Sequence, residues 1–243
     1  MWNAMLWGGI SGSAVLIGAL LALLLPIKKK AIAYIMSFGT GILIGAAAYE
    51  LLGQSMDDAG MKETSIGFLI GAGMFTLFDL FISKQGGENR KRSGENAPGN
   101  SGLAIFAGTV MDAIPESIMI GASLIEKQAV SWLLVIAIFM SNIPEGISST
   151  TGLKKSGYSK RKILFLWSSV FVISALGSLG GFTFLEGASA SMTAIIASFA
   201  GGGIIAMVAS TMMPEAYQEG GPVVGLITAL GLLTSLALDS LSL

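Results

Sequence analysis

GLAIFAGTVMDAIPESIMIGASL, residues 102–124, and AVSWLLVIAIFMSNIPEGISSTTG, residues 129–152, decide the fold of this chain. Each stretch is an apolar run of about 20 residues, the length that spans the hydrocarbon core of a bilayer as an α-helix. Each also contains a Pro-Glu pair near its middle, at 115–116 and 144–145. We therefore expect two neighbouring, kinked transmembrane helices that carry carboxylates at membrane depth.

The composition of the whole chain indicates a membrane protein. Of its 243 residues, 53% are hydrophobic and only 12% are charged, whereas a soluble domain carries about 25% charged residues. The apolar runs predict an all-α, polytopic membrane protein with eight transmembrane helices. We expect these helices at residues 3–26, 31–52, 65–83, 102–124, 129–152, 161–183, 191–213 and 222–240. One transmembrane domain then covers residues 1–243, with a flexible, polar loop at about 84–101.

The basic residues set the expected orientation. The loops after the first, third and fifth predicted helices hold 12 of the 14 Lys and Arg residues. Cytoplasmic loops carry the excess of Lys and Arg, so we expect both termini outside the cytoplasm and the loop at 84–101 inside it. The chain is then an integral protein of the cytoplasmic (inner) membrane. With a net charge of −1 and no basic stripe, it is not expected to bind nucleic acid.

An internal repeat is also expected. The string GILI at 41–44 in the second predicted helix resembles GIIA at 203–206 in the seventh, and both lead into acidic residues. Under the expected topology the second helix runs outward and the seventh runs inward. This predicts two inverted three-helix repeats that flank helices 4 and 5, a common transporter plan.

The polar residues of helices 4 and 5 predict a cation site. Asp112 and Glu116 are four residues apart and share one helix face, as do Ser141 and Glu145. A carboxylate near the bilayer centre costs about 2.5–3.5 kcal/mol on insertion scales. No Lys or Arg lies at membrane depth in any predicted helix, so a bound cation or a proton has to compensate these charges.

The residue types limit the ligands of such a cation. The chain has no Cys and no His, which leaves oxygen ligands, with Met sulfur as the only soft option. Each proline frees the backbone carbonyl four residues earlier, that of Met111 or Met140. Carboxylates, an amide, a hydroxyl and carbonyls form the ligand set of a hard divalent ion. The predicted metal ligands are Asp112, Glu116, Ser141, Asn142 and Glu145.

The motif NIPEG at 142–146 resembles a signature of the ZIP family of divalent-metal transporters, and the Pro-Glu pair at 115–116 is similar to that family's fourth-helix motif. The resemblance implies eight helices, outside termini, a zinc-like substrate, a metal pathway between helices 4 and 5, and a homodimer. Asp112 stands at the family's His position, Ala113 at its Asn and Ser117 at its Gly. These departures favour a harder ion, Mn²⁺, Fe²⁺ or Mg²⁺, over Zn²⁺.

Three further acidic residues are expected along the pathway. Glu50 lies at the outer end of the second helix and is similar in character to the family's polar residue near the outer mouth. Glu215, in the segment MPEA at 213–216, resembles the family's seventh-helix Pro-Glu segment and lies at the inner end. Asp79 lies near the inner end of the third helix.

Three functions remain open from the sequence. The first is a divalent-cation transporter, which is not an enzyme. The second is a membrane protein that binds metal without passing it, as a sensor or a degenerate homologue. The third, an intramembrane hydrolase, needs one Asp on each of two helices, and helix 5 offers only Asn142 and Glu145.

Overall fold

The computed structural model describes residues 1–82, 101–126 and 130–241. These residues form helices joined by short connections, which confirms the all-α class for the described part of the chain. The predicted loop at 84–101, apart from Ser101, lies outside the described residues, and so does Lys127. The elements are α1 (Trp2–Leu24), α2 (Lys29–Gly45), η1 (Ala46–Gly53), α3 (Gln54–Ile82), α4 (Ser101–Glu126), α5 (Trp132–Lys155), α6 (Lys160–Leu185), α7 (Ala190–Met207), η3 (Val208–Met212), α8 (Met213–Gly220) and α9 (Val223–Leu241).

Seven helices of the described residues are long and apolar enough to cross a membrane, against eight predicted. The difference arises because the predicted helices 31–52 and 65–83 belong to one helical run of 54 residues, Lys29–Ile82. This run passes through the π-helical segment η1 and leaves the helical conformation at Gly60, where φ is 81° and ψ is −178°. Almost only glycine adopts these angles, so Gly60 marks the end of one helix and the start of the next.

The chain repeats this path near its C-terminal end. Helix α7 continues through the π-helical η3 into the short helix α8, and Gly221, with φ of 71° and ψ of −162°, separates α8 from α9. The prediction ended both helices too early, at residues 52 and 213. It did so because apolar periodicity stops there, whereas the polar residues that follow, such as Gln54 and Glu215, are helix formers that continue the helix beyond the apolar run.

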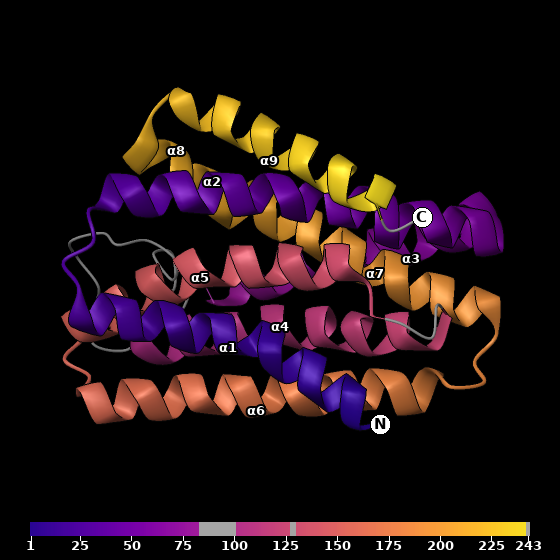
Figure 1. Cartoon of the computed structure of the whole chain (residues 1–243), viewed down its shortest axis with the longest axis horizontal. Coiled ribbons are helices and arrows are strands. Elements are labelled where there is room, and N and C mark those ends of the chain that lie inside the picture. Colours follow the sequence, from indigo (N-terminus) through magenta and orange to yellow (C-terminus); the bar gives the residue numbers. More distant parts are fainter. Residues whose placement is uncertain (83–100, 127–129, 242–243) are drawn as a thin grey trace.

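The helices pack as two groups whose axes run along the long dimension of the molecule (Figure 1). Helix α1 packs on α5 and α6, and α4 packs on α6, so these four helices form what we call the α1 group. Helix α3 packs on α7, and α2 packs on α8 and α9, so these helices with η1 and η3 form the α2 group. The largest contact between the groups joins α2 to α5. Helix α5 is therefore central: 78% of its most apolar window is buried, compared with 17% for α9.

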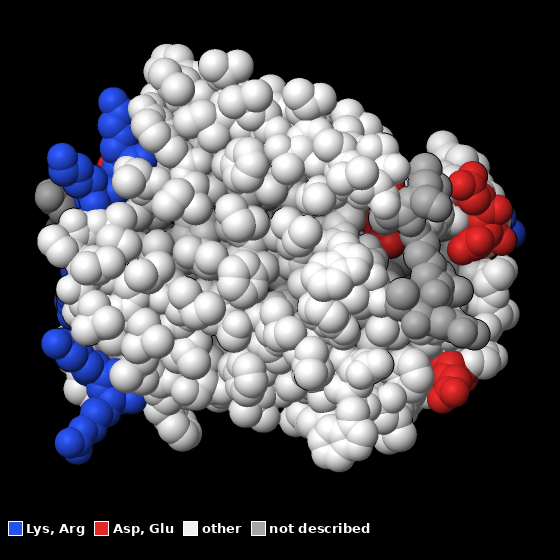
Figure 2. Space-filling model, in the orientation of Figure 1, with Lys and Arg blue, Asp and Glu red and all other residues white. Residues whose placement is uncertain are grey.

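Charged residues separate to the two ends of the bundle (Figure 2). Exposed Lys and Arg of the segments 28–30 and 154–162 gather at one end, which we call the basic end. Exposed Asp57, Asp58 and Glu186 lie at the opposite, acidic end. The apolar middle between these ends is the pattern expected of a bundle that crosses a bilayer. The structure thus supports a polytopic helical membrane protein.

Candidate cation site

The predicted ligands all lie inside the bundle. Helices α4 and α5 each continue through their internal proline, Pro115 and Pro144, and place the neighbouring polar residues at mid-length. None of the predicted ligands faces the outside of the molecule. Their exposed fractions are Asp112 7%, Glu116 3%, Ser141 1%, Asn142 4% and Glu145 2%.

Two hydrogen bonds join α4 to α5 at this depth. The Asn142 amide nitrogen Nδ2 on α5 donates to Oε2 of Glu116 on α4 across 3.5 Å. The Thr109 hydroxyl on α4 donates to Oε1 of Glu145 on α5 across 2.9 Å. Each helix therefore presents one carboxylate that a neutral donor of the other helix orients. Asp112 lies between Thr109 and Glu116 on the same face of α4, because the three residues are spaced by three and four.

Thr109 is a site residue that the sequence reading missed. It is 2% exposed and its hydroxyl touches Glu145, the acid of the fifth-helix motif. A donor that holds a ligating carboxylate fixes the carboxylate's orientation toward a metal. The sequence could have indicated Thr109 only through its spacing, because it stands three residues before Asp112 and on the same face of the helix. A threonine in an apolar helix is too common for that spacing alone to single it out.

The predicted oxygen ligands differ in their surroundings. Within residues 1–82, 101–126 and 130–241, no three acidic side chains stand close enough together to form a chelating group by themselves. The Ser141 hydroxyl donates within its own helix, to the Ile138 carbonyl at 3.0 Å. The Met140 carbonyl, freed by Pro144, lies against α2, because a Cβ built on Gly39 would be only 2.8 Å from its oxygen. A cation here would thus draw on carboxylates from two helices, completed by amide and hydroxyl oxygens.

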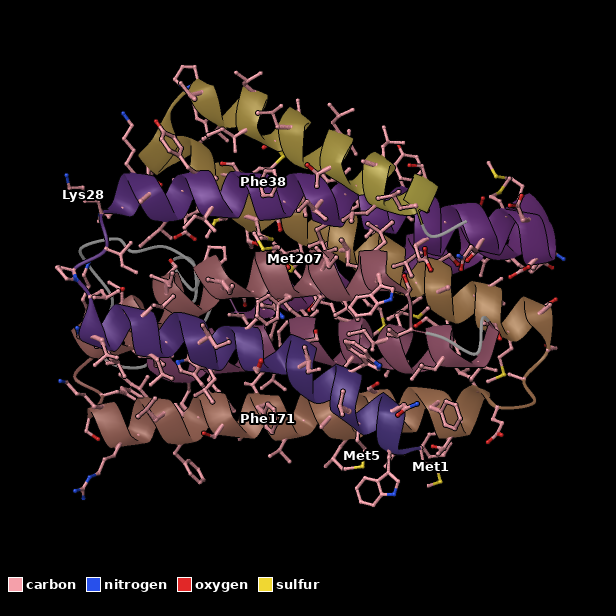
Figure 3. All side chains as sticks on the ribbon, in the orientation of Figure 1. Met1, Met5, Lys28, Phe38, Phe171 and Met207 are labelled. Atoms are coloured by element: carbon pink, nitrogen blue, oxygen red, sulfur yellow. The ribbon has the colours of Figure 1, made fainter. Side chains whose placement is uncertain are left out.

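An apolar cavity of about 560 Å³ adjoins the site between α3, α4 and α7. Asp112 and Glu116 are the acidic residues of its lining. The remaining lining is apolar and includes Phe75, Phe106 and the buried Met207, labelled near the centre of Figure 3. The acids therefore border a low-dielectric space, in which a nearby charge acts more strongly than in water.

Glu50 lies toward the acidic end of the bundle, near Asp58. It belongs to η1, is 4% exposed, and lines a small cavity of about 10 Å³ with Asp58 and Gln54. From α4, Met119 and Ser123 line the same cavity. Helical spacing places these two residues three and seven positions beyond Glu116, on the side of α4 that carries the predicted ligands. The cavity therefore adjoins the face of α4 that carries Asp112 and Glu116, nearer to the acidic end than these two residues.

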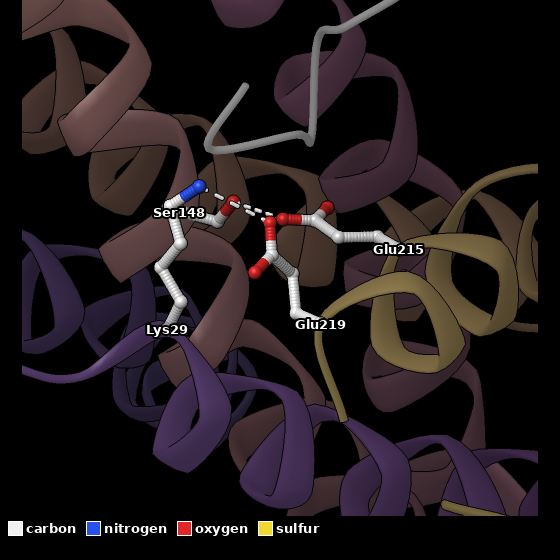
Figure 4. Close-up of polar contacts among 4 residues, drawn as sticks. All are labelled: Lys29, Ser148, Glu215 and Glu219. Atoms are coloured by element: carbon white, nitrogen blue, oxygen red, sulfur yellow. Dashed lines mark hydrogen bonds and ion pairs between the residues drawn. The ribbon is translucent and has the colours of Figure 1, made fainter. Parts of the chain in front are cut away.

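Glu215 lies toward the basic end, on α8, and is 4% exposed. The Ser148 hydroxyl on α5 donates a short hydrogen bond to its Oε1, so Glu215 links the two helix groups (Figure 4). Ser148 is three residues after Glu145 and on the same face of α5. The sequence reading missed Ser148, whose link to Glu215 spans 67 residues of chain and carries no local signal.

Asp79, the last predicted pathway residue, lies near the end of α3. It is half-buried, three residues before the end of α3, and lines none of the cavities that Asp112, Glu50 or Glu215 line. Seven of the eight predicted site residues thus lie on α4 or α5, line a cavity with residues of α4, or bond to α5. No family model matches this chain, and no curated protein matches its sequence.

Proposed function

We propose that this protein is a divalent metal cation transporter of ZIP type, with the cation held between α4 and α5 at the middle of the membrane. One observation carries the proposal. Glu116 and Glu145 are buried in adjacent, proline-containing helices, and each accepts a hydrogen bond from a neutral donor on the other helix. Buried charges are retained where they are paired or where they coordinate metals.

The chemistry of the donors favours a hard ion. The side chains at the site offer carboxylate, amide and hydroxyl oxygens, and the chain supplies neither thiolate nor imidazole. Such sites suit Mg²⁺ and Mn²⁺. The substrate we propose is therefore Mn²⁺, Fe²⁺ or Mg²⁺ in preference to Zn²⁺. The described Lys and Arg residues lie at the start of α2, near Gly60, at the end of α5 and at the start of α6, away from the mid-length of α4 and α5.

The expected eight crossings follow if the run Lys29–Ile82 crosses the membrane twice, once on each side of Gly60. Two inverted repeats are supported by backbone geometry. The π-helical segments begin at residues 46 and 208, and the glycines with positive φ that end the following helices are Gly60 and Gly221. The distance along the sequence from residue 46 to residue 208 is nearly the same as that from Gly60 to Gly221. Such matching irregularities are expected of duplicated units that run in opposite directions.

We propose that the basic end faces the cytoplasm, because cytoplasmic loops carry the excess of Lys and Arg. The pathway then runs from Glu50 at the outer end, past Glu116 and Glu145, to Glu215 at the inner end. The separation into an α1 group and an α2 group supports a mechanism in which one block moves against the other and exposes the ion to each side in turn.

Uptake into proteoliposomes tests this function. We expect the native chain to accumulate Mn²⁺ and Glu145→Gln or Glu116→Gln to lose most of this uptake, since each substitution removes a charge but keeps the side-chain shape. Glu186→Gln, at an exposed position beyond the end of α6, is the matched control and should transport normally. Metal binding without uptake by the native chain would instead support a sensor or a degenerate homologue. A wide preference for Zn²⁺ over Mn²⁺ in competition would contradict the proposed hard-ion selectivity.

A further inference from the structure

The basic end of the proposed pathway holds an ion pair. The Lys29 ammonium, at the start of α2, lies 3.2 Å from Oε1 of Glu219 on α8. Glu219 is four residues after Glu215, so both acids lie on the same face of α8. Figure 4 shows the side chains of Lys29, Ser148, Glu215 and Glu219 turned toward one another from α2, α5 and α8.

Three of these groups share a small cavity at the basic end. Lys29, Glu215 and Glu219 line one cavity together with Ile32, Ala33 and Met36. Its volume is about 10 Å³, which is room for about one water molecule. Glu215 and Met36 are buried, whereas the side chains of Lys29 and Glu219 are 45% and 25% exposed. The ion pair therefore lies on the exposed side of this cavity, at the basic end.

We propose that Lys29 determines which cations leave through the inner end, because its ammonium pairs with Glu219 beside the cavity that Glu215 also lines. This inference rests on the proposed transport function and adds a residue that sets the charge selectivity of the exit. A cation that arrives from Glu145 and Ser148 has to displace the ammonium from Glu219 before it reaches solvent.

Lys29 can discriminate between monovalent and divalent ions because its ammonium is attached to the chain. The ammonium is covalently held beside Glu219, so its effective concentration there is high. A monovalent ion brings the same charge and gains no Coulomb advantage over it. A divalent ion gains twice the Coulomb energy at the same distance, so it displaces the ammonium more readily. Lys29 should therefore favour the passage of divalent ions over monovalent ones.

A single introduced cysteine tests access to the exit. The chain has no Cys, so Met36→Cys, at a fully buried position of the cavity lining, provides a unique thiol. Purified protein in detergent is labelled with a cationic or an anionic methanethiosulfonate reagent of similar size. We expect Lys29→Gln to speed labelling by the cationic reagent about two- to fivefold, the range that an exposed ion pair allows. The anionic reagent should gain less, because Glu219 has then lost its pairing with Lys29 and repels it.

Two variants control for nonspecific effects. Lys30→Gln removes the same charge from the next residue, whose ammonium lies over the Tyr34 ring at 5.9 Å, and should leave labelling unchanged. The exchanged pair Lys29→Glu with Glu219→Lys should restore slow labelling if the ion pair itself closes the exit. Equal labelling rates in Lys29→Gln and Lys30→Gln would overturn the inference.

Transport measurements separate this inference from the proposed function. In proteoliposomes, Lys29→Gln should reduce the preference for Mn²⁺ over Na⁺, whereas Lys30→Gln should keep it. Unchanged labelling and unchanged selectivity, with Mn²⁺ uptake intact in the native chain, would remove the role of Lys29 alone. Absence of Mn²⁺ uptake in the native chain would remove the proposed function and, with it, the exit that Lys29 is proposed to control.

Discussion

Replacing Gly146, which follows Glu145 in the fifth-helix motif, by alanine should force α1 and α5 apart. A Cβ built on Gly146 would lie 2.3 Å from the carbonyl oxygen of Val15 on α1. The approach is reciprocal, because a Cβ on Gly18 would lie 2.3 Å from the Ile143 oxygen on α5. Ordinary contact begins at 3.4 Å, so the two backbones must separate by about 1 Å to accept the methyl group. Both partners are backbone oxygens, which cannot rotate away as a flexible side chain would.

The expected cost follows from this overlap. Overpacking a well-packed interior costs about 1–3 kcal/mol. For a chain of this length 1 kcal/mol shifts the melting temperature by about 2–4 °C, so Gly146→Ala should melt about 2–12 °C below a control that gains the same methyl group without a clash. A misplacement of about 1 Å beside Glu145 can also reduce function by as much as 100-fold. Mn²⁺ uptake should therefore fall even in protein that remains folded.

Gly73→Ala in α3 and Gly225→Ala in α9 are the matched controls, because a Cβ at either glycine meets no atom within 4 Å. Both should melt at or slightly above the native temperature, since alanine favours the helix over glycine. Unfolding can be followed by intrinsic fluorescence of the four Trp residues. If Gly146→Ala melts within about 2 °C of the controls and transports normally, the close α1–α5 contact does not hold Glu145 in place.

Thr109→Val should weaken metal binding by about 10- to 100-fold, the usual effect of losing a group that orients a ligand, because the bond from its hydroxyl to Glu145 is lost. Thr109→Ser should keep most of the affinity in the same calorimetric titration, and equal losses in both variants would assign Thr109 a packing role instead. Gly60→Ala should destabilise the protein by about 1–3 kcal/mol, since its φ of 81° suits glycine and no neighbouring atom would contact the methyl group. A fluorescence melt indistinguishable from that of Gly73→Ala would show that this turn tolerates other residues.

The sequence predicts the helical class well because apolar runs of membrane length are an unambiguous signal. Six of the eight predicted segments correspond to separate long helices, and the other two lie in the run Lys29–Ile82. Hydropathy cannot report that this run continues past residue 52, because the polar residues of 53–59 keep helical hydrogen bonds at the end of the bundle. Hydropathy also misses α8, because its residues 213–220 mix polar and apolar types and yet form a helix.

The sequence likewise predicts some features of the candidate site and misses others. Burial of Asp112, Glu116 and Glu145 follows from their place at mid-helix, and spacing within one helix predicts which face they share. Contacts between helices have no such local rule. Ser148 meets Glu215 because α5 packs near α8, and Gly146 of the motif packs against α1. The motif NIPEG therefore combines a chemical role at its glutamate with a packing role at its glycine.

Glycines within each group bring the backbones of paired helices into direct contact. In the α1 group a Cβ on Gly181 of α6 would lie 2.1 Å from the Ile118 oxygen of α4. In the α2 group a Cβ on Gly71 of α3 would lie 1.9 Å from the Phe199 oxygen of α7. Backbones this close have no side chains between them that could change rotamer, and each glycine fits against one particular turn of its partner. The paired helices are therefore expected to move together.

Between the two groups, the described glycines make one backbone approach under 3 Å, that of Gly39 on α2 to the Met140 oxygen on α5. This contact lies beside Ser141 and Asn142, at the depth of the candidate cation site. If the groups move against each other as proposed, they must either break this contact or turn about it. Turning about it leaves the cation near the axis and opens one end of the interface as the other closes. A contact at site depth therefore suits alternating access better than a contact at either end of the bundle would.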